Sequence, residues 1–124
     1  MNKLTKAEEE IMQIIWRLGP CTVSDVRDDI EKTTGQPKPP HSSISTIVRI
    51  LEEKGFLTHK TYGRTYEYRP LVSKTAYSKL SLEKLVTDYF DGSMERLVSF
   101  MVREKDLKPD DLTELLDSLE EEEN

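Results

Sequence analysis

Hydrophobic and polar residues alternate with a helical period in the stretch that begins at His41. Apolar side chains recur three and four positions apart, which places them on one face of a helix. These side chains are Ile44, Ile47, Val48 and Leu51. An offset polar face with the same spacing comprises Ser42, Ser45, Thr46 and Arg49. Gly55 is expected to end this helix, because glycine readily adopts the positive φ of a C-terminal cap.

Two short runs rich in Thr, Tyr and apolar residues follow this helix directly, at residues 56–60 and 65–69. They flank Tyr62-Gly63-Arg64, a sequence typical of a turn, so the pattern predicts a β-hairpin. A helix with a narrow polar face, followed at once by a hairpin with a basic tip, is typical of a winged-helix DNA-binding domain. The polar face taken alone is also compatible with a solvated helix or with a surface that binds a protein.

The same periodicity predicts two helices before His41. The first covers about residues 6–18 and starts at a capping box of Thr5 and Glu8. Its expected buried face consists of Ala7, Ile11, Ile14, Ile15 and Leu18. The second covers about residues 23–33, with Val23, Val26 and Ile30 facing inward. Trp16 is expected to pack against the base of the hairpin, and Cys21 to be a small buried residue in a one-bridge strand.

Three more helices are predicted after Ser73, the last of them starting at Pro109. Their apolar stripes are Leu82, Leu85, Val86, Tyr89 and Phe90, then Met94, Leu97, Val98 and Met101, then Leu112, Leu115, Leu116 and Leu119. So small a unit buries little area and is marginal alone. We therefore expect these stripes to form a homodimer. The alternative is that they fold back onto the preceding domain.

These elements predict a mainly α fold with a small β-hairpin (α+β). Residues 1–72 are expected to form a winged helix-turn-helix DNA-binding domain, and residues 73–124 a three-helix dimerisation region. The formal net charge of −6 argues at first against a nucleic-acid partner. However, residues 73–124 carry 7 Lys and Arg against 14 Asp and Glu, whereas residues 33–72 carry 6 against 3. Since local potential governs contact with phosphate, the hairpin region remains suited to DNA.

Side chains on the polar helix face and on the hairpin are the candidate DNA contacts. They are Ser42, Ser43, Ser45, Thr46, Arg49, Lys60, Thr61, Tyr62 and Arg64. Hydroxyl groups and Arg49 are suited to base edges or phosphates, and Arg64 and Lys60 to phosphates. Tyr62 is expected to lie along the sugar-phosphate backbone. Tyr66 and Tyr68 are interpreted as packing residues.

The sequence contains two histidines, His41 and His59, and one cysteine, Cys21. This set supplies neither a clustered nucleophile and base nor linked His and Cys ligands for a metal. We therefore expect a protein that is not an enzyme and that needs no metal or cofactor. No secretory signal or long apolar run is visible, so we expect a cytoplasmic location and no insertion into a membrane.

A series of short motifs runs along nearly the whole chain. They are Leu4-Thr5-Lys6-Ala7-Glu8 with Ile15-Trp16, Thr22-Val23-Ser24-Asp25-Val26, Ser45-Thr46-Ile47-Val48-Arg49-Ile50-Leu51, Lys54-Gly55-Phe56-Leu57, Gly63-Arg64, Tyr68-Arg69-Pro70, Leu97-Val98-Ser99-Phe100 and Asp106-Leu107. In this order they resemble the penicillinase repressor family, which includes the β-lactamase and methicillin-resistance repressors of bacteria.

The resemblance implies a homodimeric winged-helix repressor that binds a palindromic double-stranded DNA operator and blocks transcription of β-lactamase or related resistance genes. It also implies relief by a sensor-linked protease that cleaves the dimerisation region. The family's cleaved bond lies between an Asn and a Phe, and the matching bond here joins Ser99 and Phe100. Copper-responsive relatives carry a C-terminal cysteine motif that is absent here, which argues against copper sensing.

Overall fold

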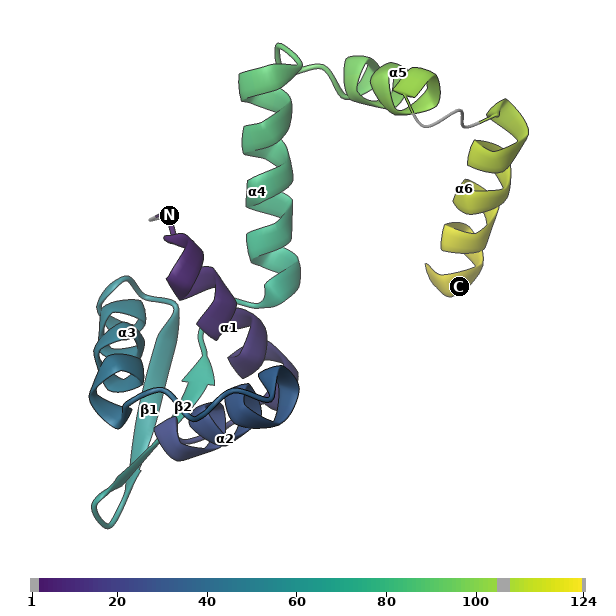
Figure 1. Ribbon diagram of the computed structural model, residues 1–124. Helices are drawn as coiled ribbons and strands as arrows, with labels where there is room; N and C mark the ends of the chain where they lie inside the picture. Colours follow the sequence, from purple (N-terminus) through teal and green to yellow (C-terminus); the bar gives the residue numbers. More distant parts are fainter. Residues whose placement is uncertain (1–2, 105–107, 124) are drawn as a thin grey trace. The chain divides into compact units, whose positions relative to one another are not determined.

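Helices and strands follow one another in the order shown in Figure 1, a computed structural model that describes residues 3–104 and 108–123, with side chains as far as Leu119. The elements are α1 (Lys6–Leu18), α2 (Val23–Thr34), α3 (His41–Glu53), β1 (Leu57–Tyr62), β2 (Thr65–Pro70), α4 (Lys74–Tyr89), α5 (Met94–Glu104) and α6 (Pro109–Glu123). The predicted fold class, mainly α with one small hairpin, is confirmed. The chain divides into two compact units, one up to Tyr77 and one from Ser78.

Capping boxes start both α1 and α2. The Glu8 backbone N–H donates to Thr5 Oγ1 at 3.2 Å, and the Thr5 N–H donates to Glu8 Oε1 at 2.9 Å. Thr22 and Asp25 make the same reciprocal pair at the start of α2. Each box satisfies two backbone donors that a helix leaves unbonded at its N-terminus. Both predicted helix starts are therefore confirmed.

The buried face of α1 is rotated relative to the prediction. Ile11 and Ile15 are buried as expected, but Ala7 is exposed and Leu18 keeps 39% of its surface. Met12 is buried completely in their place. Residues 8, 11, 12 and 15 lie on one helical face, and its polar member, Glu8, is acceptable there because Lys54 binds it. The periodicity located the helix correctly but misplaced the two ends of its stripe.

The core of the N-terminal unit joins α1, α2, α3 and the hairpin. Its most deeply buried side chains are Phe56, Met12, Ile15, Leu51, Leu57, Val26 and Val48. The predicted apolar face of α3 is confirmed, since Ile44, Val48 and Leu51 are buried and Ile47 is half-buried. In Figure 1 the three helices and the hairpin form one group, with α3 beside β1.

The hairpin pairs β1 with β2 in antiparallel register, from Leu57 opposite Pro70 to Tyr62 opposite Thr65. The predicted strands, 56–60 and 65–69, need correction at their ends, because β1 begins one residue later and extends to Tyr62, and β2 extends to Pro70. Phe56 precedes β1, because its N–H donates to Leu51 O at 2.9 Å and its own carbonyl accepts from Leu71 at 2.8 Å. Tyr62 belongs to β1, which leaves only Gly63-Arg64 for the turn. The Gly63 φ of 61° is a conformation that a two-residue hairpin turn requires and glycine adopts freely.

Trp16 and Cys21 both occupy the structural positions expected of them. Trp16 Nε1 donates to the Val72 carbonyl at 2.9 Å, just after the hairpin, and its ring lies 5.8 Å from that of Tyr77. Cys21 is 3% exposed and forms a single antiparallel bridge with Tyr68. These contacts join the hairpin base to the C-terminal end of α1.

The helices α4, α5 and α6 have bounds close to those predicted. Ser73 Oγ accepts from the Ala76 N–H and Ser93 Oγ from the Arg96 N–H, which caps α4 and α5. α4 ends at Tyr89 because Asp91 and Gly92 both adopt positive φ. The Phe90 and Phe100 rings lie 5.5 Å apart and pack the end of α4 on α5. The Asp106-Leu107 motif lies outside the described residues.

Candidate nucleic-acid interface

The polar face of α3 is available to a partner along most of its length. Ser42, Thr46 and Arg49 are exposed, and Ser45 is half-buried. Thr46 Oγ1 donates to the Ser42 carbonyl at 2.8 Å, and Arg49 Nη2 donates to Ser45 Oγ at 3.4 Å. Ser43 is also exposed, but it lies about 100° around the helix from Ser42. It therefore borders the face instead of belonging to it.

The wing, defined as β1, β2 and the Gly63-Arg64 turn, projects its outer half from the core. Lys60, Thr61, Tyr62 and Arg64 are all exposed, Tyr62 by 56%. Because side chains alternate along a strand, Lys60 and Tyr62 share one side of the wing and Thr61 takes the other. Two cationic groups and two hydroxyl groups are thus displayed around its tip.

The two remaining wing tyrosines differ in burial. Tyr68 is 4% exposed, as a packing residue should be, and burial raises the pKa of its phenol. Tyr66 is 49% exposed, which makes the packing interpretation only half right for this residue. Its ring nevertheless stacks on the His59 imidazole, with centroids 4.3 Å apart and planes 17° from parallel.

A polar cleft of about 200 Å³ separates the N-terminal ends of α2 and α3 from the wing. It brings together two candidates that are far apart in the sequence, Ser45 of α3 and Arg64 of the turn. It is also lined by Thr65 of the wing and by Thr22, Ser24 and His41, and the sequence did not indicate the last three as site residues. Because side chains of both predicted DNA-reading elements line this cleft, their hydroxyl and cationic groups form one continuous surface.

In the described part of the chain, one side-chain hydrogen bond joins α3 to the wing. His59 Nδ1 lies 2.6 Å from Glu52 Oε2, and both side chains are about 30% exposed. Glu52 belongs to the last turn of α3, and His59 is the third residue of β1. Neither residue was a predicted site residue, because each looks like an ordinary surface position in the sequence.

The connector before α3 is tied to α2 at two points. Arg27 Nε donates to the Pro39 carbonyl at 2.8 Å, and Lys38 Nζ lies 2.7 Å from Asp28 Oδ1. The bond to Asp28 raises the pKa of Lys38. The prolines of the connector prevent it from continuing α2. These restraints set where the N-terminal end of α3 begins.

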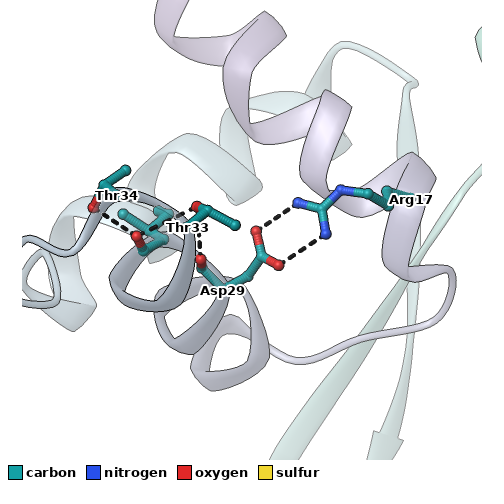
Figure 2. A network of polar contacts seen from close by, with 5 residues as sticks. Arg17, Asp29, Thr33 and Thr34 are labelled. Carbon is teal, nitrogen blue, oxygen red and sulfur yellow. Dashed lines mark hydrogen bonds and ion pairs between the residues drawn. The ribbon is translucent and has the colours of Figure 1, made fainter.

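A buried carboxylate ties α1 to α2, as Figure 2 shows. Arg17 Nη1 and Nη2 lie 2.9 and 2.6 Å from the two oxygens of Asp29, whose side chain is 8% exposed. The hydrogen bonds from Arg17 outweigh burial and hold the pKa of Asp29 below its usual range. The Asp29 carbonyl also accepts from Thr33 Oγ1 at 2.8 Å. This bidentate pair fixes the helix that supports α3.

Glu8 and Lys54 make a second tie, between α1 and the C-terminal end of α3, at 2.5 Å. Burial by itself raises the pKa of Glu8, but the hydrogen bonds from Lys54 and from the Thr5 backbone outweigh it and lower that pKa overall. α3 is therefore held at both ends, by the connector at its start and by Lys54 at its finish.

The C-terminal unit exposes apolar side chains on all three helices. Among the predicted dimer residues, those with 40% or more of their surface exposed are Leu82, Leu85, Tyr89, Met94, Val98, Met101, Leu115, Leu116 and Leu119. Phe90, Leu97 and Leu112 are half-buried. The prediction needs a correction at Val86, which is 4% exposed in the single chain and offers no surface to a second one. Leu85, Tyr89, Phe90, Leu97, Phe100 and Met101 line an apolar groove of about 580 Å³.

Ser99 and Phe100 lie in the middle of α5, and both are exposed. A peptide bond in a regular helix must open before a protease can bind it as an extended strand. The candidate cleavage bond is thus accessible on the surface but held in a helical conformation.

The described residues bring no three His, Cys, Asp or Glu side chains together as a metal site. None of the described helices has the length and apolar character needed to cross a membrane. Burial raises the pKa of the Cys21 thiol to about 11, which makes it a poor nucleophile.

Known proteins match both the whole chain and its N-terminal part. The family model for the penicillinase repressor matches residues 4–121. The penicillinase repressor of Bacillus licheniformis is 27% identical over 123 residues, covering 98% of this chain and 93% of that protein. The methicillin resistance regulatory protein MecI of Staphylococcus aureus strain N315 is 25% identical over 114 residues, covering 91% and 89%.

The solution structure of the DNA-binding domain of the repressor BlaI matches 62% of this chain and 94% of its own length, with 29% identity and a TM-score of 0.50. That match confirms the winged-helix architecture of the N-terminal unit. The match of the family model over nearly the whole chain identifies the family, as the motif order had predicted. The chain belongs to the penicillinase repressor family of DNA-binding transcriptional repressors.

Proposed function

We propose that the protein acts as a homodimer that binds a palindromic operator through two copies of α3 and the wing and so blocks transcription. The observation that carries this proposal is the continuous surface formed by the exposed face of α3, the polar cleft and the wing. An α-helix fits the major groove, where Ser, Thr and Arg side chains read base edges. The wing then lies against the backbone, where Arg64 and Lys60 meet phosphates.

The exposed apolar faces of α4, α5 and α6 support the dimer. Exposed apolar side chains on all three helices of so small a unit indicate a partner. A second copy of the chain is the simplest partner, because a two-fold dimer matches two half-sites of an operator. Each half-site contact then strengthens the other, since the second binding event becomes intramolecular.

The regulated genes are proposed from the relatives. Their names refer to penicillinase and to methicillin resistance, which supports control of β-lactamase or related resistance genes. Release by proteolysis at Ser99-Phe100 is a further proposal. A cut there would divide α5 and detach α6, which together carry the exposed Met94, Met101, Leu115, Leu116 and Leu119.

Recovery of bound DNA tests the proposed function. Purified protein is mixed with sheared genomic DNA, and the retained fragments are sequenced. We expect enrichment of a two-fold symmetric sequence and an affinity that falls steeply with salt concentration. Retention of proteins but of no DNA would instead identify the winged helix as a protein-interaction module.

Two variants test how the surface reads DNA. Arg64→Ala is expected to weaken binding to all duplexes alike, because it meets phosphate. Thr46→Ala and Arg49→Ala are expected to relax sequence preference, by about 1–3 kcal/mol for each lost base contact. An unchanged preference in both α3 variants would exclude α3 as the reading helix.

Cleavage is tested separately from DNA binding. Ser99→Asn introduces the family's residue before the bond, and Phe100→Ala removes the residue after it. If the bond is the control point, a host with an active sensor pathway cleaves wild type and Ser99→Asn but not Phe100→Ala. An intact wild-type chain under induction would exclude this bond and leave the operator proposal standing.

A further inference from the structure

The wing is fastened to the core at its base only. Leu57 and Tyr68 are 1% and 4% exposed, and they occupy the part of the hairpin nearest the core. Beyond them every residue from Lys60 to Tyr66 is exposed. A two-stranded ribbon without further packing is only marginally stable in water. The direction of the outer wing therefore depends on the side-chain contact that β1 makes next to Leu57.

His59 makes that contact. It stands opposite Tyr68 in the strand register, one step outward from Leu57 on the same face of β1. Its Nδ1 reaches Glu52 of α3 at 2.6 Å, and its ring stacks on Tyr66. Within the part of the chain that the structure describes, this is the one side-chain bond between α3 and the wing. All four wing candidates for DNA contact, Lys60, Thr61, Tyr62 and Arg64, lie beyond it.

We propose that His59 is a positioning residue for DNA binding, whose bond to Glu52 fixes the wing against α3. Glu52 lies three residues after Arg49, so the bond sets the wing directly against the helix face that reads bases. The inference rests on the proposed DNA-binding function, because a groove and its flanking backbone require α3 and the wing tip at a fixed separation.

Amide hydrogen exchange in the full-length protein without DNA tests the bond itself. We expect His59→Ala and Glu52→Ala to speed exchange of the β1 and β2 amides roughly threefold. This is the size of effect expected when a partly exposed polar side-chain contact is lost. Amides of α1 and α2 should keep their wild-type rates, which shows that the variants fold. Thr58→Val, next to His59 on the opposite face of β1, is the matched control. Wing exchange unchanged in both alanine variants would overturn the inference, whatever the DNA result.

Rescue by a conservative variant separates positioning from simple support. The probe is the genomic fragment that wild type retains most strongly. His59→Ala should bind this fragment roughly threefold more weakly than wild type, and His59→Gln, which keeps a donor for Glu52, should recover most of that loss. A His59→Gln variant that binds no better than His59→Ala would overturn the inference.

The two proposals fail in different ways. If wild type retains no DNA, the proposed function is wrong, while the exchange measurement still decides whether His59 holds the wing. If wild type binds DNA and His59→Ala binds it equally well, DNA binding stands and the positioning role of His59 is wrong.

Discussion

The two units of the chain bury their apolar residues to very different extents. In the N-terminal unit thirteen apolar side chains from α1, α2, α3 and the hairpin form one buried cluster. Among the described side chains from Ser78 onward only Val86 is buried, and large apolar side chains lie exposed on every helix. The N-terminal unit therefore completes its core within one chain, whereas the C-terminal unit leaves apolar surface exposed for the proposed dimer to cover.

This difference separates the tasks of the two units. A closed core and polar ties hold α3 and the wing base in place, so the reading surface exists in each single chain. Under the proposed dimer, the exposed apolar surface makes association the property that regulation can change. Such regulation needs no conformational signal through the DNA-binding unit.

Truncating one phenylalanine in each unit is the strongest test of the comparison. Phe56 is fully buried, so Phe56→Ala should cost about 3–5 kcal/mol of unfolding free energy. Phe100 is 46% exposed, and Phe100→Ala should leave the N-terminal transition unchanged. Urea unfolding followed by fluorescence of Trp16, the single tryptophan, reports on the N-terminal unit alone. A loss below about 1 kcal/mol in Phe56→Ala would contradict a closed core.

A charge on the exposed leucine surface of α6 tests the open unit. Leu116 is 60% exposed, and Leu116→Glu should weaken the proposed dimer roughly 100-fold by burying an unpaired carboxylate in its interface. Ser118→Glu adds the same charge to α6 away from the leucine row and serves as the control. Sedimentation velocity measures both, and an equal effect of the two variants would argue against a leucine-lined interface.

Two neighbouring aspartates of α2 sharpen the comparison between buried and exposed ion pairs. Asp29→Ala removes a buried carboxylate from Arg17 and should cost about 1–2 kcal/mol of stability. Asp28→Ala removes an exposed one from Lys38 and should cost under about 0.5 kcal/mol. Urea midpoints measured by Trp16 fluorescence give both values. Equal losses of unfolding free energy in the two variants would mean that the buried Arg17–Asp29 pair stabilises the protein no more than the exposed pair does.

Acidification should lower the unfolding free energy of the N-terminal unit by less than Asp29→Ala does. The pKa values of Asp29 and Glu8 are lowered by folding from ordinary values of 3.8 and 4.5. Their stabilisation is therefore fully present above those ordinary values and is lost as pH falls through the lowered ones. The loss should stay below about 1 kcal/mol for each group. Glu8→Gln should flatten this part of the pH profile, and an unchanged acid slope in that variant would exclude Glu8 as a contributor.

Local signals in the sequence predicted most of the helices and strands correctly. Capping boxes at Thr5 and Thr22, the breaking sequence Asp91-Gly92-Ser93 and the apolar face of α3 act over a few residues, so they are readable from the chain. Met12 was missed because a neighbouring pattern of Ala7 and Leu18 fitted the helical period equally well. Only the packing of α1 against α3, through the pair of Glu8 and Lys54, decides between the two stripes.

The candidate site was predictable residue by residue but not as an arrangement. The polar face of α3 and the basic turn of the wing follow from spacing and turn chemistry. Their junction does not, because Glu52 and His59 look like ordinary surface residues until the hairpin folds back on α3. The same holds for Arg17 and Asp29, which are twelve residues apart and on different helices. Pairs of this kind depend on tertiary proximity, which no local pattern encodes.

If the leucine row exposed on α6 forms the proposed dimer, repression depends on the amount of protein in the cell. Under the proposed dimer, at chain concentrations below the dimer dissociation constant, the dimer population grows with the square of the chain concentration. Halving the number of chains then lowers the operator-binding species about fourfold. Partial degradation or dilution by growth is thus amplified into a sharper change in gene expression than either would cause for a monomer.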